Sequence, residues 1–254
     1  MHRVIDTPWN TAHHLPQLAT SGVKTLIRFF NHRNSKKLPE KGITRDEALA
    51  IGHAGLSLCT VFQQRSGAFG HIRDLSAATG HKDAQRAVDL ADWIEQPEQS
   101  AIYFAVGFDY TKPEDMAAIT DYFAAVSNVL DGRYRLGVFA SGAVARKVLD
   151  AKLADFVWLA AAKGWSGTMD MLKTSDWALY QNAPAIKNPV VHCANTVSQA
   201  WSDFGQFSPG GTPASQARQT TMNANRGILI KEQRRSASTG VKPPLGRVGN
   251  SSAA

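Results

Sequence analysis

Residues Ala101–Asp109 read AIYFAVGFD, an apolar run between Ser100 and the Tyr-Thr-Lys-Pro turn that follows it. Its length and its Ile, Val, Tyr and Phe content predict a strand buried on both faces, as in a parallel sheet. Because side chains alternate between the faces of a strand, Gly107 and Asp109 share one side. A carboxylate at the C-terminal tip is where parallel barrels and doubly wound sheets present a catalytic group. The alternative is that Asp109 caps the following turn or helix.

Strand and helix patterns alternate along the chain on both sides of this run. The other predicted strands are Val4–Asp6, Val23–Phe30, Leu56–Phe62, Tyr134–Ala140, Phe156–Ala160, Trp177–Gln181 and Pro189–Cys193. The predicted helices are Thr11–Thr20, Thr44–Ala54, Lys82–Glu95, Pro113–Leu130 and Ala143–Leu153, with a helical turn at Ser198–Phe204. Eight strands in this rhythm predict an α/β fold, a (β/α)8 TIM-type barrel with short or degenerate late helices. An open doubly wound sheet is the alternative, although IDTPWN after the first strand lacks its glycine-rich phosphate turn.

Charge divides the chain into two parts. From Ser208 onward there are seven of the 28 basic residues but only one of the 21 acidic residues, so residues 1–207 hold 21 basic and 20 acidic residues. We expect residues 1–207 to form one barrel domain and residues 208–254, rich in Ser, Gly and Pro, to be a disordered basic tail. A near-neutral body argues against nucleic acid as its partner, whereas the tail suits an anionic partner, a docking or export role, or none.

Several function classes lack their usual sequence signals. No apolar run approaches the ~20 residues of a membrane span, and Val4–Asp6 leaves no room for a signal peptide, so we expect a cytoplasmic protein or export by a signal-independent route. Cys59 and Cys193 read as buried thiols, with one disulfide left open. The histidines show no metal-ligand spacing, Ser141 stands in F-A-S-G-A rather than a nucleophile elbow, and no cofactor is implied.

Polar and aromatic residues gather where the predicted strands end. A cleft that mixes carboxylates, amides and exposed indoles suits a sugar, because hydroxyls take directional hydrogen bonds and pyranose C–H faces pack on flat rings. The two strand-end acids, Asp6 and Asp109, are the candidate catalytic pair, since glycoside hydrolysis usually needs two carboxyl groups. The candidate ligand-binding residues are Trp9, Arg28, Asn31, Gln63, Ser141, Trp165, Tyr180, Gln181 and Asn195. Trp9 and Trp165 fit core packing under the loops equally well.

The segments VIDTPWN, VKTLIRFFNH, TRDEALAIGHAGLSLCTVFQ, IYFAVGFD, LGVFASG, VWLAAAKGWSG and WALYQ resemble one known family over roughly residues 3–207. This is the DUF1906 group of glycoside-hydrolase-like barrels, which is similar in fold to the family 25 lysozymes, or N-acetylmuramidases. The resemblance implies a TIM-type barrel with its site at the strand C-termini and suggests cell-wall glycan, or peptidoglycan, as the ligand.

The resemblance also assigns the acids. Its first-strand acid falls on Asp6, and its fourth-strand motif A-V-D-F-D/E falls on Ala105–Asp109, which puts the lysozymes' catalytic acid at Asp109. The first acid of that motif is Gly107 here, and a late Asp-x-Asn or Asp-x-Asp reads Cys-Ala-Asn from Cys193. Three hypotheses follow: a lysozyme-like hydrolase, a glycan-binding module that has lost the chemistry, and an effector or interaction protein whose tail directs docking.

Overall fold

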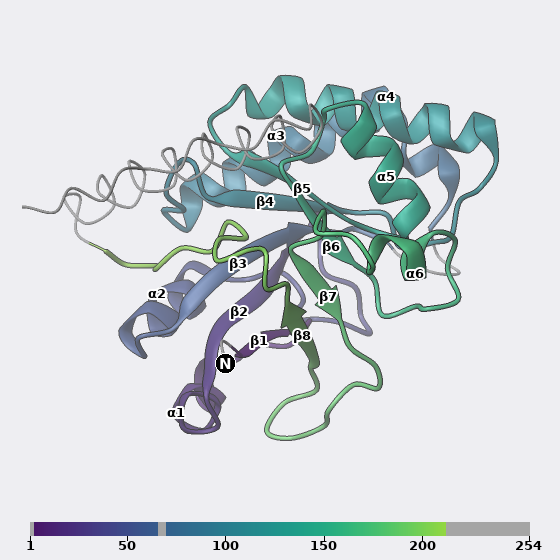
Figure 1. The fold of residues 1–254 in the computed structure, drawn as a ribbon. Coiled ribbons are helices and arrows are strands. Elements are labelled where there is room, and N and C mark those ends of the chain that lie inside the picture. The colour runs from purple at the N-terminus through teal and green to yellow at the C-terminus, as the bar shows by residue number, and fades with distance from the viewer. Residues whose placement is uncertain (1–2, 66–69, 212–254) are drawn as a thin grey trace, which may run out of the picture.

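The structure, a computed structural model, describes residues 3–65 and 70–211, and within them eight strands close into one barrel in chain order (Figure 1). The strands are β1 (Arg3–Asp6), β2 (Val23–Phe30), β3 (Ser57–Phe62), β4 (Ala101–Ala105), β5 (Arg135–Ala140), β6 (Phe156–Leu159), β7 (Leu179–Gln181) and β8 (Cys193–Val197). The α-helices are α1 (Leu15–Thr20), α2 (Arg45–His53), α3 (Ala77–Trp93), α4 (Pro113–Leu130), α5 (Gly142–Asp150) and α6 (Thr168–Met171). The predicted TIM-like barrel is confirmed.

The eighth strand differs from its prediction in place and direction. It spans Cys193–Val197 rather than Pro189–Cys193, and it pairs antiparallel with both β7 and β1, while the first seven strands are parallel. Residues 182–192 are too few for the helical crossover that a parallel connection requires, so the chain turns back directly. Within residues 172–211 the structure consequently has no helix that covers the late strands, and a long loop joins β7 to β8 (Figure 1).

The fourth strand is shorter than predicted. β4 ends at Ala105, and only the N–H of Val106 continues the pairing, by donating to the carbonyl of Phe139 at 2.8 Å. Gly107 and Asp109 therefore belong to the loop between β4 and α4, whose helix begins at Pro113 as predicted. The candidate acid thus lies on a loop rather than at a strand tip.

Local hydrogen bonds set several helix boundaries. Thr44 and Ser141 cap α2 and α5 by accepting hydrogen bonds from backbone N–H groups three residues later. Ser76 caps α3 in the same way, and this helix consequently begins at Ala77, before the predicted Lys82. A 3-10 helix, η1 (Ala12–His14), precedes α1 where a single helix was predicted, and another, η3 (Ile72–Asp74), precedes α3. Residues 198–204 contain turns rather than the expected helical turn.

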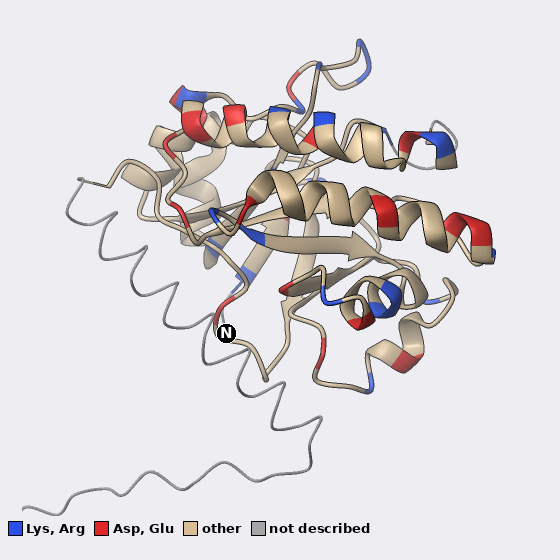
Figure 2. Cartoon of the chain, turned by 90° about the horizontal axis from the view of Figure 1, so that it is seen from above, with Lys and Arg blue, Asp and Glu red and all other residues tan. Residues whose placement is uncertain are grey.

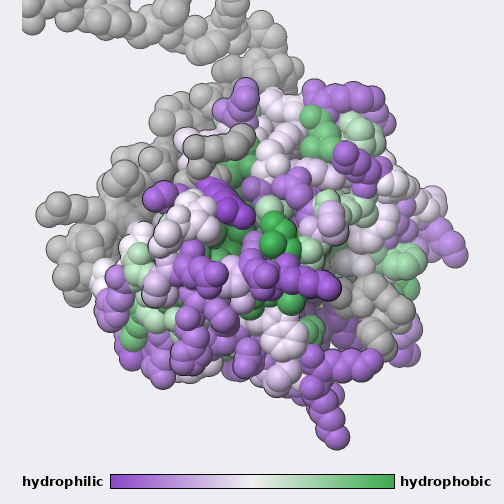
Figure 3. All heavy atoms as spheres, turned by 90° about the horizontal axis from the view of Figure 1, so that it is seen from below, coloured by the Kyte–Doolittle hydropathy of each residue, from purple (hydrophilic) through white to green (hydrophobic). Residues whose placement is uncertain are grey.

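The core has two layers. Side chains on one face of each strand fill the barrel, among them Val4, Ile27, Tyr103 and Trp158. The opposite faces pack against the helices, and α3, α4 and α5 lie together over β4, β5 and β6 (Figure 1). The outer surfaces of these helices carry basic and acidic residues of mixed sign (Figure 2). The face that lies below in Figure 1 is mostly hydrophilic with small apolar areas (Figure 3).

The chain after β8 closes the N-terminal end of the barrel. The Tyr103 hydroxyl inside the barrel donates to the carbonyl of Phe204 at 2.8 Å, and Asp203 pairs with buried Arg135 at 2.7 Å. Buried Pro209 packs so close to α2 that a Cβ added at Gly52 would lie 2.0 Å from its carbonyl oxygen. The packed part of the chain therefore extends past the predicted boundary at 207, and residues 212–254 of the predicted tail lie outside the described residues.

Candidate functional site

A hollow of about 340 Å³ opens at the C-terminal ends of the parallel strands. Aromatic rings and two amide side chains line much of it: Phe29, Phe139, Trp158, Trp165, Gln63 and Gln181. Because one end of the barrel is closed by residues 203–209, the open mouth is where a ligand can reach the interior-facing side chains.

Asp6 lies at the end of β1, behind the Gln181 side chain that lines the hollow, and only 5% of its surface is exposed. Its two oxygens accept hydrogen bonds from the amides of Asn195 at 2.8 Å and Gln181 at 2.9 Å. The indole N–H of Trp158 donates to the carbonyl oxygen of Asn195 at 2.8 Å, which fixes the amide with its NH₂ toward Asp6. Burial raises the pKa of Asp6 to about 6, although both amide bonds act in the opposite direction.

The Asp109 carboxylate is hydrogen-bonded to a neighbouring loop. Each of its oxygens accepts from the backbone N–H of Ser166 at 3.0 Å, and one also accepts from the Ser166 hydroxyl at 3.0 Å. These bonds tie the loop after β4 to the loop between β6 and α6, which carries Trp165 into the hollow. In the described residues Asp6 and Asp109 therefore have separate partners, and the geometry makes Asp109 a positioning residue for Trp165.

Gly107 lines the hollow at the position where the family resemblance places an acid, and it also lines a second hollow of about 170 Å³. The two hollows share Gln63, Ala105 and Gly107, so they meet at the residue that lacks a side chain. In the second hollow the ring of His32 contacts Asp83, Nε2 to Oδ1, at 2.7 Å.

Cys193 stands directly opposite Asp6 in the β1–β8 pairing. Its burial and the neighbouring Asp6 raise the pKa of the thiol to about 11, so it does not supply a second negative charge at neutral pH. Cys59 is buried inside the barrel, and both cysteines are free thiols, which removes the disulfide left open by the sequence.

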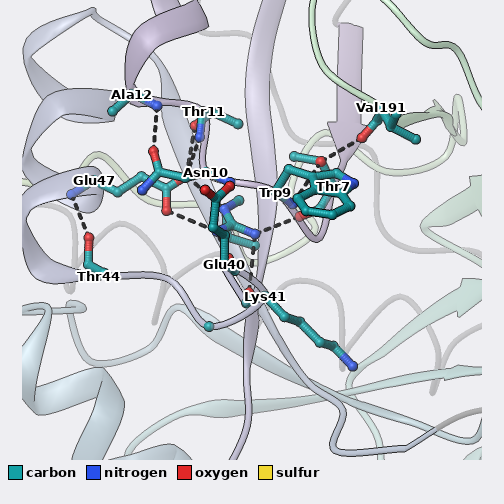
Figure 4. A network of polar contacts seen from close by, with 12 residues as sticks. Thr7, Trp9, Asn10, Thr11, Ala12, Glu40, Lys41, Thr44, Glu47 and Val191 are labelled. Atoms are coloured by element: carbon teal, nitrogen blue, oxygen red, sulfur yellow. Dashed lines mark hydrogen bonds and ion pairs between the residues drawn. The ribbon is translucent and has the colours of Figure 1, made fainter. Parts of the chain in front are cut away.

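Arg28 was predicted to bind ligand, but the structure places it away from the hollow. Its fully buried guanidinium pairs with Glu47 at 2.8 Å and donates to the backbone carbonyls of Thr7, Glu40 and Lys41 (Figure 4). The Glu47 carboxylate also accepts from the backbone N–H and the hydroxyl of Thr11. A charge with this many internal partners holds the loops after β1 and β2 together.

The other predicted ligand residues divide between the mouth and the rest of the fold. Gln63, Trp165 and Gln181 line the hollow, and Asn195 accepts a hydrogen bond from Trp158, which also lines it. Ser141 is buried as the cap of α5, and Tyr180 packs outward against the helix layer. The remaining two line neither hollow: Asn31, which bonds Asn34, and Trp9, which lies beside Thr7 (Figure 4).

Lys41, which the sequence did not single out, contacts two residues that line the hollow, although it lines neither hollow itself. It is 7% exposed, its ammonium donates to the Gln63 side chain at 3.1 Å, and it lies 5.1 Å from the centre of the Phe29 ring. Burial lowers its pKa to about 8. The sequence KLPEKG contains no feature that separates this lysine from the exposed Lys36 and Lys37 before it.

No cluster of three or more His, Cys, Asp or Glu side chains suits a metal ion in the part of the chain that the structure describes. Over the same residues, no helix has both the length and the apolar character needed to cross a bilayer.

Several solved structures share this fold. The Mycobacterium tuberculosis Tat-secreted protein Rv2525c, solved with HEPES, aligns with a TM-score of 0.68 at 19% identity over 81% of this chain and 98% of its own. An uncharacterized B. stearothermophilus protein aligns with a TM-score of 0.58 at 17% identity, over 82% of this chain and 100% of its own. The modular autolysin LytC of Streptococcus pneumoniae aligns with a TM-score of 0.50 at 10% identity, over 76% of this chain and 46% of its own. At these identities the likeness shows the fold alone.

Sequence comparison identifies the family. The uncharacterized protein YbfG of Bacillus subtilis (strain 168) is 27% identical over 183 residues, which are 67% of this chain but only 24% of that protein, so the chain spans about a quarter of this relative. The sequence model described as "Rv2525c-like, glycoside hydrolase-like domain" matches residues 16–227, most of the chain. The resemblance noted from the sequence is thereby confirmed, and the chain belongs to the Rv2525c-like family of glycoside hydrolase-like domains.

Proposed function

We propose that the barrel mouth binds a cell-wall glycan of the peptidoglycan class. The observation that supports this best is the composition of the 340 Å³ hollow, in which flat rings such as Trp165 stand beside the amides of Gln63 and Gln181. Sugar rings pack their C–H faces on aromatic surfaces, and amides match their hydroxyl groups. Membership of a glycoside hydrolase-like family and the fold shared with the autolysin LytC favour the same ligand class.

Binding without efficient turnover is the form of this proposal that the geometry favours. Glycoside hydrolysis usually needs one carboxyl group as acid and a second as base or nucleophile. Both carboxylate oxygens of Asp109 accept hydrogen bonds from Ser166. Gly107 and Cys193 occupy the positions where the resemblance places further acids. Of the predicted pair only Asp6, which is 5% exposed, is then left for the reaction, and losing the second participant typically lowers the rate by orders of magnitude.

Hydrolysis is the second candidate function, and Asp6 is the observation that favours it. A carboxyl group with a pKa of about 6 is partly protonated near neutral pH, as a general acid must be. In this reading Asp6 protonates the leaving oxygen, and Asp109 serves only after its bonds to Ser166 open.

The test incubates the purified protein with insoluble peptidoglycan and with chitin-type oligosaccharides, and measures both retention and new reducing ends. We expect retention without reducing ends, and weaker retention for Trp165→Ala than for Trp93→Ala, which removes an exposed indole on α3. Reducing ends that disappear in Asp6→Asn would instead establish hydrolysis. Absence of retention on every glycan would refute the proposal.

A Gly107→Asp variant separates the two candidates further. It returns a carboxyl group to the position where both hollows meet, so a binding module that lost its chemistry gains activity, whereas a working hydrolase has its cleft narrowed. The measurement is again the release of reducing ends from peptidoglycan, with wild type and Gly107→Asn as matched references.

A docking role for the basic C-terminal residues stays a separate proposal. Residues 212–254 lie outside the described residues, so a truncation after residue 211 keeps every residue that the structure describes from 70 onward, including Pro209 against α2. If these residues direct docking to an anionic partner or export, the truncated protein folds normally but loses its localisation. Unchanged localisation would contradict this role.

A further inference from the structure

We propose that the hollow recognises a carboxylate on its sugar through the ammonium group of Lys41, so that its preferred ligand is an acidic glycan. This inference rests on the proposed function and names the chemical class of the ligand within it. Three independent features support it: the position of Lys41 beside the hollow, the way its backbone is held, and its lack of a counter-ion among the described residues.

The position of Lys41 follows from its two contacts. Gln63, which accepts its hydrogen bond at 3.1 Å, and Phe29, whose ring centre lies 5.1 Å from the ammonium, both line the 340 Å³ hollow. The ammonium therefore lies between an amide and an aromatic ring that a bound sugar would touch. Gln63 lines the second hollow as well, so the ammonium is hydrogen-bonded to a residue that both hollows share.

The backbone around Lys41 is fixed from the other side. The Arg28 guanidinium donates to the carbonyls of Glu40 and Lys41 at 2.9 and 3.2 Å, and Glu47 holds the guanidinium in place. Figure 4 shows the Lys41 side chain extending away from this network rather than into it. The charges of Arg28 and Glu47 thus balance each other, and the Lys41 ammonium lies on the side of Gln63 and Phe29.

No carboxylate pairs with Lys41 among the residues that the structure describes. Burying an ammonium without a counter-ion is unfavourable, and such groups are normally paired. The pKa of about 8 reflects this burial, and it still leaves the group mostly protonated at neutral pH. A neutral amide and an aromatic ring stabilise the cation only in part, so a carboxylate from the ligand would complete its environment.

The test compares three matched probes by NMR titration of the full chain. N-acetylglucosamine is neutral, N-acetylmuramic acid adds a lactyl carboxylate, and the carboxamide of N-acetylmuramic acid keeps the shape without the charge. We expect wild type to bind the acid about tenfold or more tightly than its carboxamide, the range of a charge-assisted hydrogen bond.

Three variants assign the preference to one atom. Lys41→Gln removes the charge, and Gln63→Glu supplies an internal carboxylate 3.1 Å from the ammonium, so both should bind acid and carboxamide equally. Gln63→Glu keeps the lysine, so it tests the inference even if Lys41→Gln folds poorly. Thermal melting shows whether each variant is folded. Lys36→Gln removes an exposed charge from the same loop and should keep the preference.

Each outcome decides the inference. A preference for the acid that is lost in Lys41→Gln and in Gln63→Glu supports it, whether or not the neutral sugar binds. Equal binding of acid and carboxamide by wild type overturns it while leaving glycan binding intact, and so does a preference that survives Lys41→Gln. If none of the three probes binds, the proposed function fails together with it.

Discussion

Replacing Asp6 by Asn is expected to remove one component of the pH dependence of stability. Burial raises the pKa of this carboxyl group from 3.8 to about 6 in the folded protein, whereas the unfolded chain keeps the ordinary value. Between these two values the folded state holds a proton that the unfolded state has released. The free energy of unfolding therefore falls as pH rises through this window.

The magnitude follows from the size of the shift. A rise of about two pKa units corresponds to about 3 kcal/mol, since one unit is about 1.4 kcal/mol. Asp6 is 5% exposed, so solvent screens this effect little. Wild type should lose about 2 kcal/mol of this between about pH 4 and pH 7, and the Asp6→Asn variant should not, since the unfolded chain is already half ionised at pH 4.

Urea denaturation at the two pH values, followed by tryptophan fluorescence, measures this difference. Asp83, whose pKa burial also raises, is present in both proteins, so its contribution cancels in the comparison. Asp121→Asn, at an exposed position on α4, controls for the substitution itself. An identical pH dependence in wild type and Asp6→Asn would refute the reasoning, because it would mean that this carboxyl group is solvated in the folded protein.

Three further substitutions test the packing around the site. Glu47→Ala leaves a buried guanidinium unpaired and should lower the free energy of unfolding by about 3–5 kcal/mol in urea; a loss below about 1 kcal/mol would contradict the buried pair. Gly137→Ala places a Cβ 2.4 Å from the Tyr103 ring and should destabilise by about 1–3 kcal/mol, seen as a lower melting temperature; an unchanged one would contradict this close contact. Asp109→Asn should speed amide exchange at Ser166 by about tenfold or more, and unchanged exchange would show that the carboxylate does not hold this loop.

Sequence patterns predicted the elements whose signal is local. β2 and α4 have the bounds that the sequence predicts, because an apolar run ends at polar residues in one and a proline opens the other. Thr44 and Ser141 carry hydroxyl groups at the starts of two helices, and each caps its helix. The eighth strand was predicted four residues too early because PVVHC is apolar, and its antiparallel direction was not predicted. The short connection before it is the signal for a reversed strand.

Features of the site that depend on distant contacts were not predictable. The sequence pattern places Arg28 and Gln63 near the ends of two predicted strands. It does not indicate that Arg28 pairs with Glu47 whereas Gln63 lines the hollow. Lys41 lies in a polar loop, and its burial depends on Phe29 and on the Arg28 network rather than on its neighbours in sequence. The partner of Asp109 is likewise 57 residues away along the chain.

The position of a bound sugar tests the central claim most directly. A crystal structure of the full chain with a chitin-type tetrasaccharide should show a sugar ring against Trp165, with its hydroxyl groups bonded to Gln181 or to Asp6 behind it. Binding elsewhere on the surface, with the mouth of the barrel holding only solvent at a saturating sugar concentration, would contradict it.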